Sequence, residues 1–316
     1  MEKLRLGIST CLLGLPVRYD GGHKLDHYLR DTLGYYVDFI PVCPEVECGL
    51  GVPREAMRLV GEADAPKLMT IRTRVDLTER MAAWALRRVK DLDEERLCGF
   101  IFKSGSPSSG MERVKVYNEK GAGVKNGVGL FARAFMDYFP DIPVEEEGRL
   151  HDPVLRENFI ERIFTCYRWK NLVHKEIPGI RTVLSFHTKN KLLILSHSTK
   201  HYQEMGRLVA GGKDLSAQEL VRRYGSLLMA AMRLKATPKK NANVLMHMMG
   251  YFKKELSSWE KAELLEVIEQ YRLSMIPLLV PLTLLKHYVR KYDQPYLKEQ
   301  TYLDPHPLEL QLRNHV

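Results

Sequence analysis

Hydrophobic and polar positions in the first half of the chain follow two alternating patterns. Short apolar runs bounded by turn residues predict strands, and apolar positions three and four residues apart predict amphipathic helices. The expected strands are 4–9, 36–42, 68–72, 97–102 and 142–144, and the expected helices are 23–33, 76–91 and 128–138. Strands that alternate with helices are typical of a mainly parallel sheet covered by helices.

The pattern becomes helical from about residue 152. The expected helices are 152–169, 181–210, 216–234, 239–254 and 258–273, followed by an apolar segment, 276–289, that contains Pro277 and Pro281. The sequence therefore predicts an α/β N-terminal domain with a mainly parallel sheet over residues 1–150. An all-α C-terminal domain is expected over residues 151–316.

Charge is divided unevenly between these halves. Residues 151–316 contain 26 Lys and Arg against 16 Asp and Glu, whereas residues 1–150 contain 22 against 23. Such asymmetry indicates an anionic partner for the second half, such as RNA, or a solvated basic surface with no partner. Both interpretations stay open.

The composition is that of a soluble globular protein, with 45% hydrophobic and 28% charged residues. No apolar run is long enough for a transmembrane helix, and the charged N-terminus lacks the apolar core of a signal peptide. We therefore expect a cytoplasmic protein. Its five cysteines are then expected to be ligands, nucleophiles or core residues rather than disulfide partners.

Three loops of chemical interest each follow an expected strand. The first contains Cys11, the second contains Cys43, Glu45 and Cys48, and the third is the Ser/Gly-rich segment 103–110. The carboxyl ends of parallel strands gather at one edge of a sheet, where ligands bind. We therefore expect the three loops to converge.

Three thiolates are too few for a closed structural zinc site, which takes four ligands. On a four-iron cluster, three thiolates leave one iron open to act as a Lewis acid. A structural zinc protein remains an alternative, as does a chance pairing of Cys43 and Cys48 in a tight turn. Cys98 and Cys166 are expected in the core, where free cysteines commonly lie.

The polar residues of these loops have both catalytic and ordinary interpretations. Glu45 can serve as the general base for a water molecule, or it can form an ion pair with Arg54 or Arg18. Ser106 and Ser108 can hydrogen-bond a small planar substrate, although Ser-Pro is also a common turn signal. Lys103 and Arg18 can hold an anionic group or lie at the surface as solvated charges.

The three loops carry three motifs in order. They are Cys-Leu-Leu-Gly with Val-Arg-Tyr-Asp-Gly from Cys11, Cys-Pro-Glu with Gly-Leu-Gly-Val-Pro-Arg from Cys43, and Lys-Ser-Gly-Ser-Pro-Ser-Ser-Gly from Lys103. In these motifs the chain resembles the thiouracil desulfidases, small bacterial proteins with an oxygen-sensitive [4Fe-4S] cluster. The resemblance covers roughly residues 4–150.

The resemblance implies a non-redox desulfuration of a thiolated pyrimidine, which is thiouracil, thiouridine or its nucleotide. Water replaces the thiocarbonyl sulfur, and sulfide leaves through the cluster. Cys11 and Cys43 match two cluster ligands, Glu45 matches the catalytic carboxylate and Ser106 matches the active-site serine. Around them, the expected substrate-binding residues are Arg18, Lys103, Ser104, Ser108 and Ser109.

One departure from the family pattern affects the cluster. Short members have their third cysteine ligand at the position of Ser109, and they have glycine at the position of Cys48. We therefore hypothesise that Cys48 replaces the usual ligand from the facing loop. The expected cofactor is a [4Fe-4S] cluster held by Cys11, Cys43 and Cys48.

The second half resembles a separate bacterial family of unknown function that also occurs fused behind this first domain. Its marks include the segments 186–191, 196–202, 243–250 and 276–281. His197 and His201 are four residues apart, a spacing that serves metal binding, phosphate contact or helix packing. An alternative function for the whole chain is an iron–sulfur sensor or a nucleic-acid-binding protein that acts on thiolated tRNA.

Overall fold

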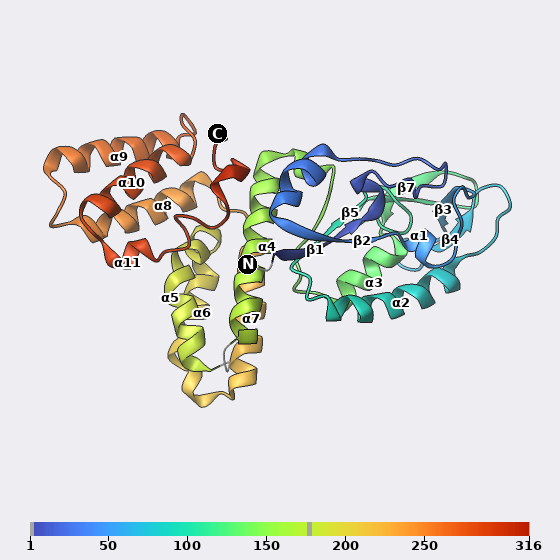
Figure 1. The fold of residues 1–316 in the computed structure, drawn as a ribbon, viewed down its shortest axis with the longest axis horizontal. Coiled ribbons are helices and arrows are strands. Elements are labelled where there is room, and N and C mark those ends of the chain that lie inside the picture. The colour runs from blue at the N-terminus through green and yellow to red at the C-terminus, as the bar shows by residue number, and fades with distance from the viewer. Residues whose placement is uncertain (1–2, 176–178, 316) are drawn as a thin grey trace. The chain divides into compact units, whose positions relative to one another are not determined.

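The computed structural model describes residues 3–175 and 179–315, and the chain divides into two compact units, Met1–Asp152 and Pro153–Val316. Figure 1 shows strands and helices mixed in the first unit and helices throughout the second. The predicted fold class, an α/β region followed by a helical region, is confirmed.

The first unit is built on a parallel sheet. Its strands are β1 (Leu4–Ser9), β2 (Val37–Val42), β5 (Phe100–Phe102) and β8 (Val144–Glu146), in the order β2-β1-β5-β8. All neighbouring pairs are parallel. The predicted parallel sheet is therefore confirmed, with the edge strand two residues later than the sequence indicates.

A second sheet was largely missed by the sequence pattern. Its strands are β3 (Met57–Val60), β4 (Lys67–Thr70), β6 (Val114–Tyr117) and β7 (Gly123–Gly127), in the order β4-β3-β6-β7. Only β4 overlaps an expected strand. β3 and β6 are only four residues long, and β7 contains two glycines, so none of them is distinct enough in the sequence to be recognised without its sheet neighbours.

The expected helix 23–33 is confirmed only in its second part. The chain stays irregular up to Asp26 and is helical from His27, with a π-helical turn over Tyr28–Thr32 and a 3-10 turn over Leu33–Tyr35. The backbone N–H groups of Lys24 and Asp26 donate to the carbonyls of Cys11 and Leu12 at 2.9 Å each. These hydrogen bonds hold residues 24–26 against the first loop, so the helix starts later than the sequence indicates.

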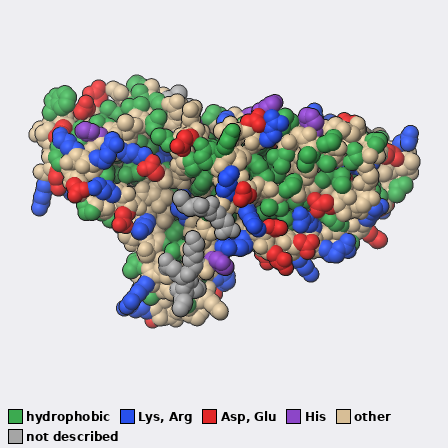
Figure 2. Space-filling view, viewed as in Figure 1, with side chains coloured by type: hydrophobic (Ala, Val, Ile, Leu, Met, Phe, Trp, Pro, Cys, Tyr) green, Lys and Arg blue, Asp and Glu red, His purple; other side chains and the backbone are tan. Residues whose placement is uncertain are grey.

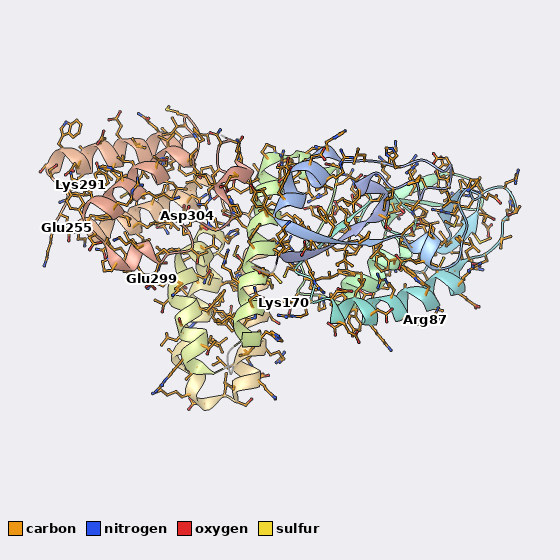
Figure 3. All side chains as sticks on the ribbon, viewed as in Figure 1. Arg87, Lys170, Glu255, Lys291, Glu299 and Asp304 are labelled. Carbon is orange, nitrogen blue, oxygen red and sulfur yellow. The ribbon has the colours of Figure 1, made fainter. Side chains whose placement is uncertain are left out.

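Two helices cover the sheets of the first unit and supply its aromatic core. Helix α2 (Thr78–Glu94) and helix α3 (Leu130–Tyr138) lie together in Figure 1, and both were expected from their helical spacing. Exposed Arg87, labelled in Figure 3, belongs to α2, whereas Trp84 of the same helix is buried. Phe100 and Phe102 of β5 stack at 4.3 Å between ring centroids, against aromatic residues of α3.

The second unit consists of helices. They are α4 (Pro153–Lys175), α5 (Ile180–His197), α6 (Thr199–Ala210), α7 (Ala217–Arg233), α8 (Pro238–Met249), α9 (Ser258–Arg272), α10 (Leu279–Lys291) and the short α11 (Pro295–Lys298). The expected helix 181–210 is two helices, because Ser198 is extended and caps α6 through the backbone N–H of His201 at 3.2 Å. Pro281 lies in the first turn of α10, where proline is tolerated.

The surface charges are mixed in sign. On the face shown in Figure 2, Lys and Arg side chains are interspersed with Asp and Glu side chains. Several cations of the second unit have acidic partners, such as Arg222 and Arg223 with Glu219. The anionic partner expected from the net charge stays a prediction. Among the described residues, no helix is long and apolar enough to cross a membrane.

His187 makes the stability of the second unit depend on pH. Burial, together with nearby Lys191, lowers the pKa of His187 to about 4, and its Nδ1 lies 3.1 Å from the Tyr224 hydroxyl. Between pH 6.5 and 4 the unfolded chain binds a proton that the folded unit does not. This residue alone should therefore lower the free energy of unfolding by about 2 kcal/mol from pH 7 to pH 5.

Urea unfolding of a variant that keeps Trp169 as its sole tryptophan measures this loss. The fluorescence of Trp169 reports on the surroundings of His187, because its ring packs on Tyr224, the partner of His187, with 4.9 Å between ring centroids. In His187→Phe the contribution of this residue should disappear, whereas exposed His247→Asn should leave the pH dependence unchanged. Equal pH dependence of the wild type and His187→Phe would contradict the assignment.

Candidate active site

A cavity of about 290 Å³ lies at the carboxyl ends of β1, β2 and β5. Cys11 lies in the turn after β1, Cys43 directly follows β2, and the loop Lys103–Gly110 follows β5. All three loops line the cavity. Because these strands are parallel neighbours, segments that are far apart in sequence meet at one edge, as the sequence predicts.

Two thiols line the cavity, and both are largely buried. Burial raises the pKa of Cys11 to about 11, against the opposing charges of Lys103 and Arg18. Burial and the neighbouring Glu45 raise the pKa of Cys43 to about 12. Both thiols are therefore protonated at neutral pH unless a metal displaces the protons.

Glu45 lies beside Cys43 in the short helix α1 (Pro44–Glu47) and is held from two sides. Its Oε1 accepts a hydrogen bond from Ser108 Oγ at 2.5 Å, and its Oε2 lies 3.8 Å from Arg54 Nη2. The Cys43 thiol donates to Oε2 at 3.5 Å. The expected ion pair with Arg54 is present, and it leaves the carboxylate at the cavity wall beside a thiol.

The serines of the third loop divide into two groups. Ser106 and Ser109 line the cavity, whereas Ser108 is fully buried behind it and is not one of the described lining residues. Ser106 Oγ and Ser108 Oγ are 3.0 Å apart, and Ser106 Oγ also accepts the backbone N–H of Ser109 at 3.1 Å. Because Ser108 donates its proton to Glu45, Ser106 is the donor between the two hydroxyls.

Lys103 and Ser104 are tied to an acidic residue that the sequence analysis missed. Glu147 accepts hydrogen bonds from Lys103 Nζ, from the Ser104 hydroxyl and from the Ser104 backbone N–H. The only sequence signal for it is its place in three consecutive glutamates after the edge strand. This pairing largely neutralises the charge of Lys103. Arg18 also lines the cavity, and its Nε lies 3.6 Å from Asp20 Oδ1.

Cys48 is not brought together with Cys11 and Cys43. It caps the far end of α1, and its Sγ donates to the carbonyl of Glu45 at 3.3 Å. Its side chain packs against the hydrophobic core and does not belong to the described residues that line the cavity. Cys98 and Cys166 are buried in the core, as expected.

A second groove, of about 530 Å³, adjoins the cavity and shares Met57, Ser104, Gly105 and Pro107 with it. It is formed mainly by the second sheet, so the sequence pattern gave no sign of it. Its charged lining residues are Arg58, Glu112, Arg113, Lys115, Lys125 and Glu146. The cations outnumber the acids, so the groove favours an anionic group.

The histidines singled out in the second unit do not form a metal site. His197 is fully buried, and its two ring nitrogens lie 2.9 Å from Glu161 Oε2 and 2.6 Å from the carbonyl of Leu234. His201 instead hydrogen-bonds Ser198 at 2.8 Å. In the described parts of the chain, no group of three His, Cys, Asp or Glu side chains is arranged to hold a metal ion.

Comparison with known proteins assigns both units to families. The sequence profile of the family described as 2-thiouracil desulfurase matches residues 6–147, and that of the DUF1722 family matches residues 191–307. The YbgA protein of Escherichia coli K12 is 32% identical over 133 residues, which is 42% of this chain and 79% of YbgA. The chain belongs to the 2-thiouracil desulfurase family through its first unit and to the DUF1722 family through its second.

Two further proteins are similar to part of this chain. The YbbK protein of Bacillus subtilis 168 is 28% identical over 132 residues, which is 40% of this chain and 85% of YbbK. The solved structure of TudS, described as a [4Fe-4S]-dependent thiouracil desulfidase, is 30% identical and covers 48% of this chain and 95% of its own length, with a TM-score of 0.38. The family membership expected from the motifs is confirmed by the profile match over residues 6–147.

The donors at the cavity fit an iron–sulfur cluster in part. Cys11 and Cys43 supply two buried thiols of the soft kind that such clusters require. The third cysteine expected at the cluster, Cys48, packs elsewhere, and the cavity wall presents the Ser109 hydroxyl instead. The residues present therefore fit a cluster with two cysteine ligands, and they do not form the set of three thiolates inferred from the sequence.

Proposed function

We propose that the cavity of this 2-thiouracil desulfurase unit hydrolyses the thiocarbonyl of a thiolated pyrimidine, releasing sulfide without a change in oxidation state. The observation that carries the proposal is the placement of Glu45. Its carboxylate is fixed by Ser108 and Arg54 beside two buried thiols, in the cavity at which three family motifs converge. TudS is described as [4Fe-4S]-dependent, and we propose the same cofactor here, held by Cys11 and Cys43.

Glu45 is the group that activates water in this proposal. Its Oε2 faces the cavity beside Cys43 and takes one proton as the water oxygen bonds to the ring carbon that carries sulfur. The carbon–sulfur bond then breaks as the carbonyl forms. Both protons of the water leave with the sulfide, one through Glu45 and one from the added hydroxyl. When bound, the cluster supplies Lewis acidity for the thiocarbonyl sulfur.

Ser106 orients the substrate ring. It donates its own proton to Ser108, and its oxygen accepts the backbone N–H of Ser109 at 3.1 Å and, more weakly, that of Ser108 at 3.4 Å. A pyrimidine ring N–H would take the place of the weaker of these two donors, because a hydroxyl oxygen has two lone pairs. Ser108 does not reach the cavity, and it acts by holding the side chains of Glu45 and Ser106 in place through its hydroxyl.

The adjoining groove favours a substrate that carries phosphate. A pyrimidine in the cavity would have its sugar and phosphate directed to a neighbouring surface, and Arg58, Arg113 and Lys115 line the groove beside it. Guanidinium and ammonium groups bind phosphate oxygens by charge-assisted hydrogen bonds. Thiouridine monophosphate or a thiolated nucleotide within RNA therefore suits this site better than the free base.

An anaerobic preparation of the full chain tests the function directly. It is incubated with thiouracil, thiouridine monophosphate and a thiolated RNA, and loss of the thiocarbonyl absorbance is measured together with released sulfide. Equal amounts of sulfide and oxygenated product are expected. Failure to release sulfide from any of the three substrates by an iron-loaded preparation would refute the proposal.

Charge reversal in the groove should affect only substrates that carry phosphate. In Arg113→Glu and Lys115→Glu, KM for thiouridine monophosphate should rise about fivefold for each reversed charge, and added salt should reduce the difference. KM for thiouracil should not change. Lys120→Glu, in the exposed turn between β6 and β7, is the matched control, and an equal effect there would count against the groove.

A further inference from the structure

The cavity offers an iron–sulfur cluster two thiols, and the third protein donor has to be found among its other residues. Cys48 is the only remaining cysteine of this loop, but its position is fixed by contacts on the other side of α1. Its backbone carbonyl accepts from Arg80 Nε at 2.7 Å, and the next carbonyl, of Gly49, accepts from Arg80 Nη2 at 2.7 Å. Arg80 of α2 therefore anchors the segment that directs the Cys48 side chain to the core.

Moving Cys48 to the cavity would disrupt several interactions together. Its Sγ would leave the carbonyl of Glu45, and its side chain would leave the hydrophobic core against which it packs. The helix of which Cys48 is the cap also carries Cys43 and Glu45 at its opposite end. A movement of this helix that carried Cys48 toward the cavity would also move Cys43 and Glu45.

Ser109 is placed at the cavity by contacts with α3. Its neighbour Ser108 accepts the backbone N–H of Phe131 at 2.9 Å, and Gly110 accepts that of Gly129 at 2.8 Å. A Cβ at position 129 would lie 2.5 Å from the Ser108 carbonyl group, so glycine is needed for this close approach. Ser109 is only 3% exposed, and its hydroxyl makes no hydrogen bond to another described residue.

We propose that the hydroxyl oxygen of Ser109, together with the thiolates of Cys11 and Cys43, is the third protein ligand of the cluster in this chain, and that Cys48 is a core residue. The inference deepens the proposed function and depends on its cofactor. The Ser109 proton leaves to solvent as oxygen binds iron, and no electron is transferred. Oxygen is a harder donor than sulfur, so this corner of the cluster should be the most easily lost.

Iron retention tests the assignment without any need for turnover. The full chain is reconstituted anaerobically, and iron and acid-labile sulfide are followed during challenge with a chelator. Ser109→Ala should lose iron at least about tenfold faster than the wild type, and Ser109→Cys should lose it about tenfold more slowly. Cys48→Ala should match the wild type, and Cys11→Ala should retain little cluster.

Ser104→Ala, in the same loop and also at the cavity wall, is the matched control and should retain iron as the wild type does. Faster loss in Cys48→Ala with no change in Ser109→Ala would overturn the inference, as would a wild type that takes up no iron. Thermal unfolding of each apo variant checks that the fold is intact. A chain that holds its cluster through Ser109 but releases no sulfide would refute the proposed function while leaving the ligand assignment in place.

Discussion

Replacing Glu45 by glutamine should lower kcat for sulfide release by about 10²- to 10⁴-fold, the usual contribution of a positioned general base. Glutamine keeps the size of the side chain and still offers an oxygen to the Ser108 hydroxyl, which lies at 2.5 Å from Glu45 Oε1. It cannot accept a proton from water. Iron and sulfide content should stay at the wild-type value, because Glu45 is not one of the proposed ligands.

Glu55→Gln is the matched control for this experiment. Glu55 lies in the same long loop, but it accepts backbone N–H groups of Arg72 and Thr73 and is not among the described residues that line the cavity. Its variant should keep full turnover. An iron–sulfur sensor would hardly respond to either substitution, so normal behaviour of Glu45→Gln in an active preparation would exclude the role proposed for it.

Replacing Glu161 by glutamine should destabilise the second unit by about 3–5 kcal/mol, the cost of removing one partner from a buried charge network. The Glu161 side chain is 3% exposed. Its Oε1 accepts from Arg313 Nη2 at 2.7 Å, and its Oε2 lies 2.9 Å from His197 Nε2. Burial alone would raise the pKa of Glu161, but Arg313 and His197 outweigh it and hold that pKa below its usual value.

The destabilisation follows from the groups left behind. Both ring nitrogens of His197 face acceptors, Glu161 Oε2 and the Leu234 carbonyl. Without the carboxylate, the buried Arg313 guanidinium keeps only the longer contact of its Nε with Glu157 Oε1, at 3.6 Å, and His197 loses one of its two acceptors. Urea unfolding followed by Trp169 fluorescence measures the change.

Glu219→Gln provides the control for a carboxylate in an exposed ion pair, with Arg222 and Arg223 as its partners. Exposed pairs contribute little to stability, so its unfolding midpoint should barely move. An unchanged midpoint in Glu161→Gln would show that the network is not held together by this carboxylate.

The sequence by itself determined the fold class and the convergence of the three loops. The strands β1, β2 and β5 are apolar and β-branched enough to be recognised locally, and a parallel arrangement obliges their carboxyl ends to meet. The strand pattern alone therefore places Cys11, Cys43 and Ser106 at one edge of the sheet. The family motifs, which lie in these same loops, added the chemistry.

Only the tertiary structure decided which side chains face the cavity. Cys43 and Cys48 are both in the loop after β2, yet one turn of helix separates them and directs their sulfur atoms to the cavity and to the core. Sequence spacing does not reveal this difference, because it depends on the contacts of Arg80 with the end of that turn. Glu147 and the groove of the second sheet were hidden for the same reason, since their partners are distant along the chain. Local pattern determines which strands form, whereas long-range packing determines the orientation of each side chain.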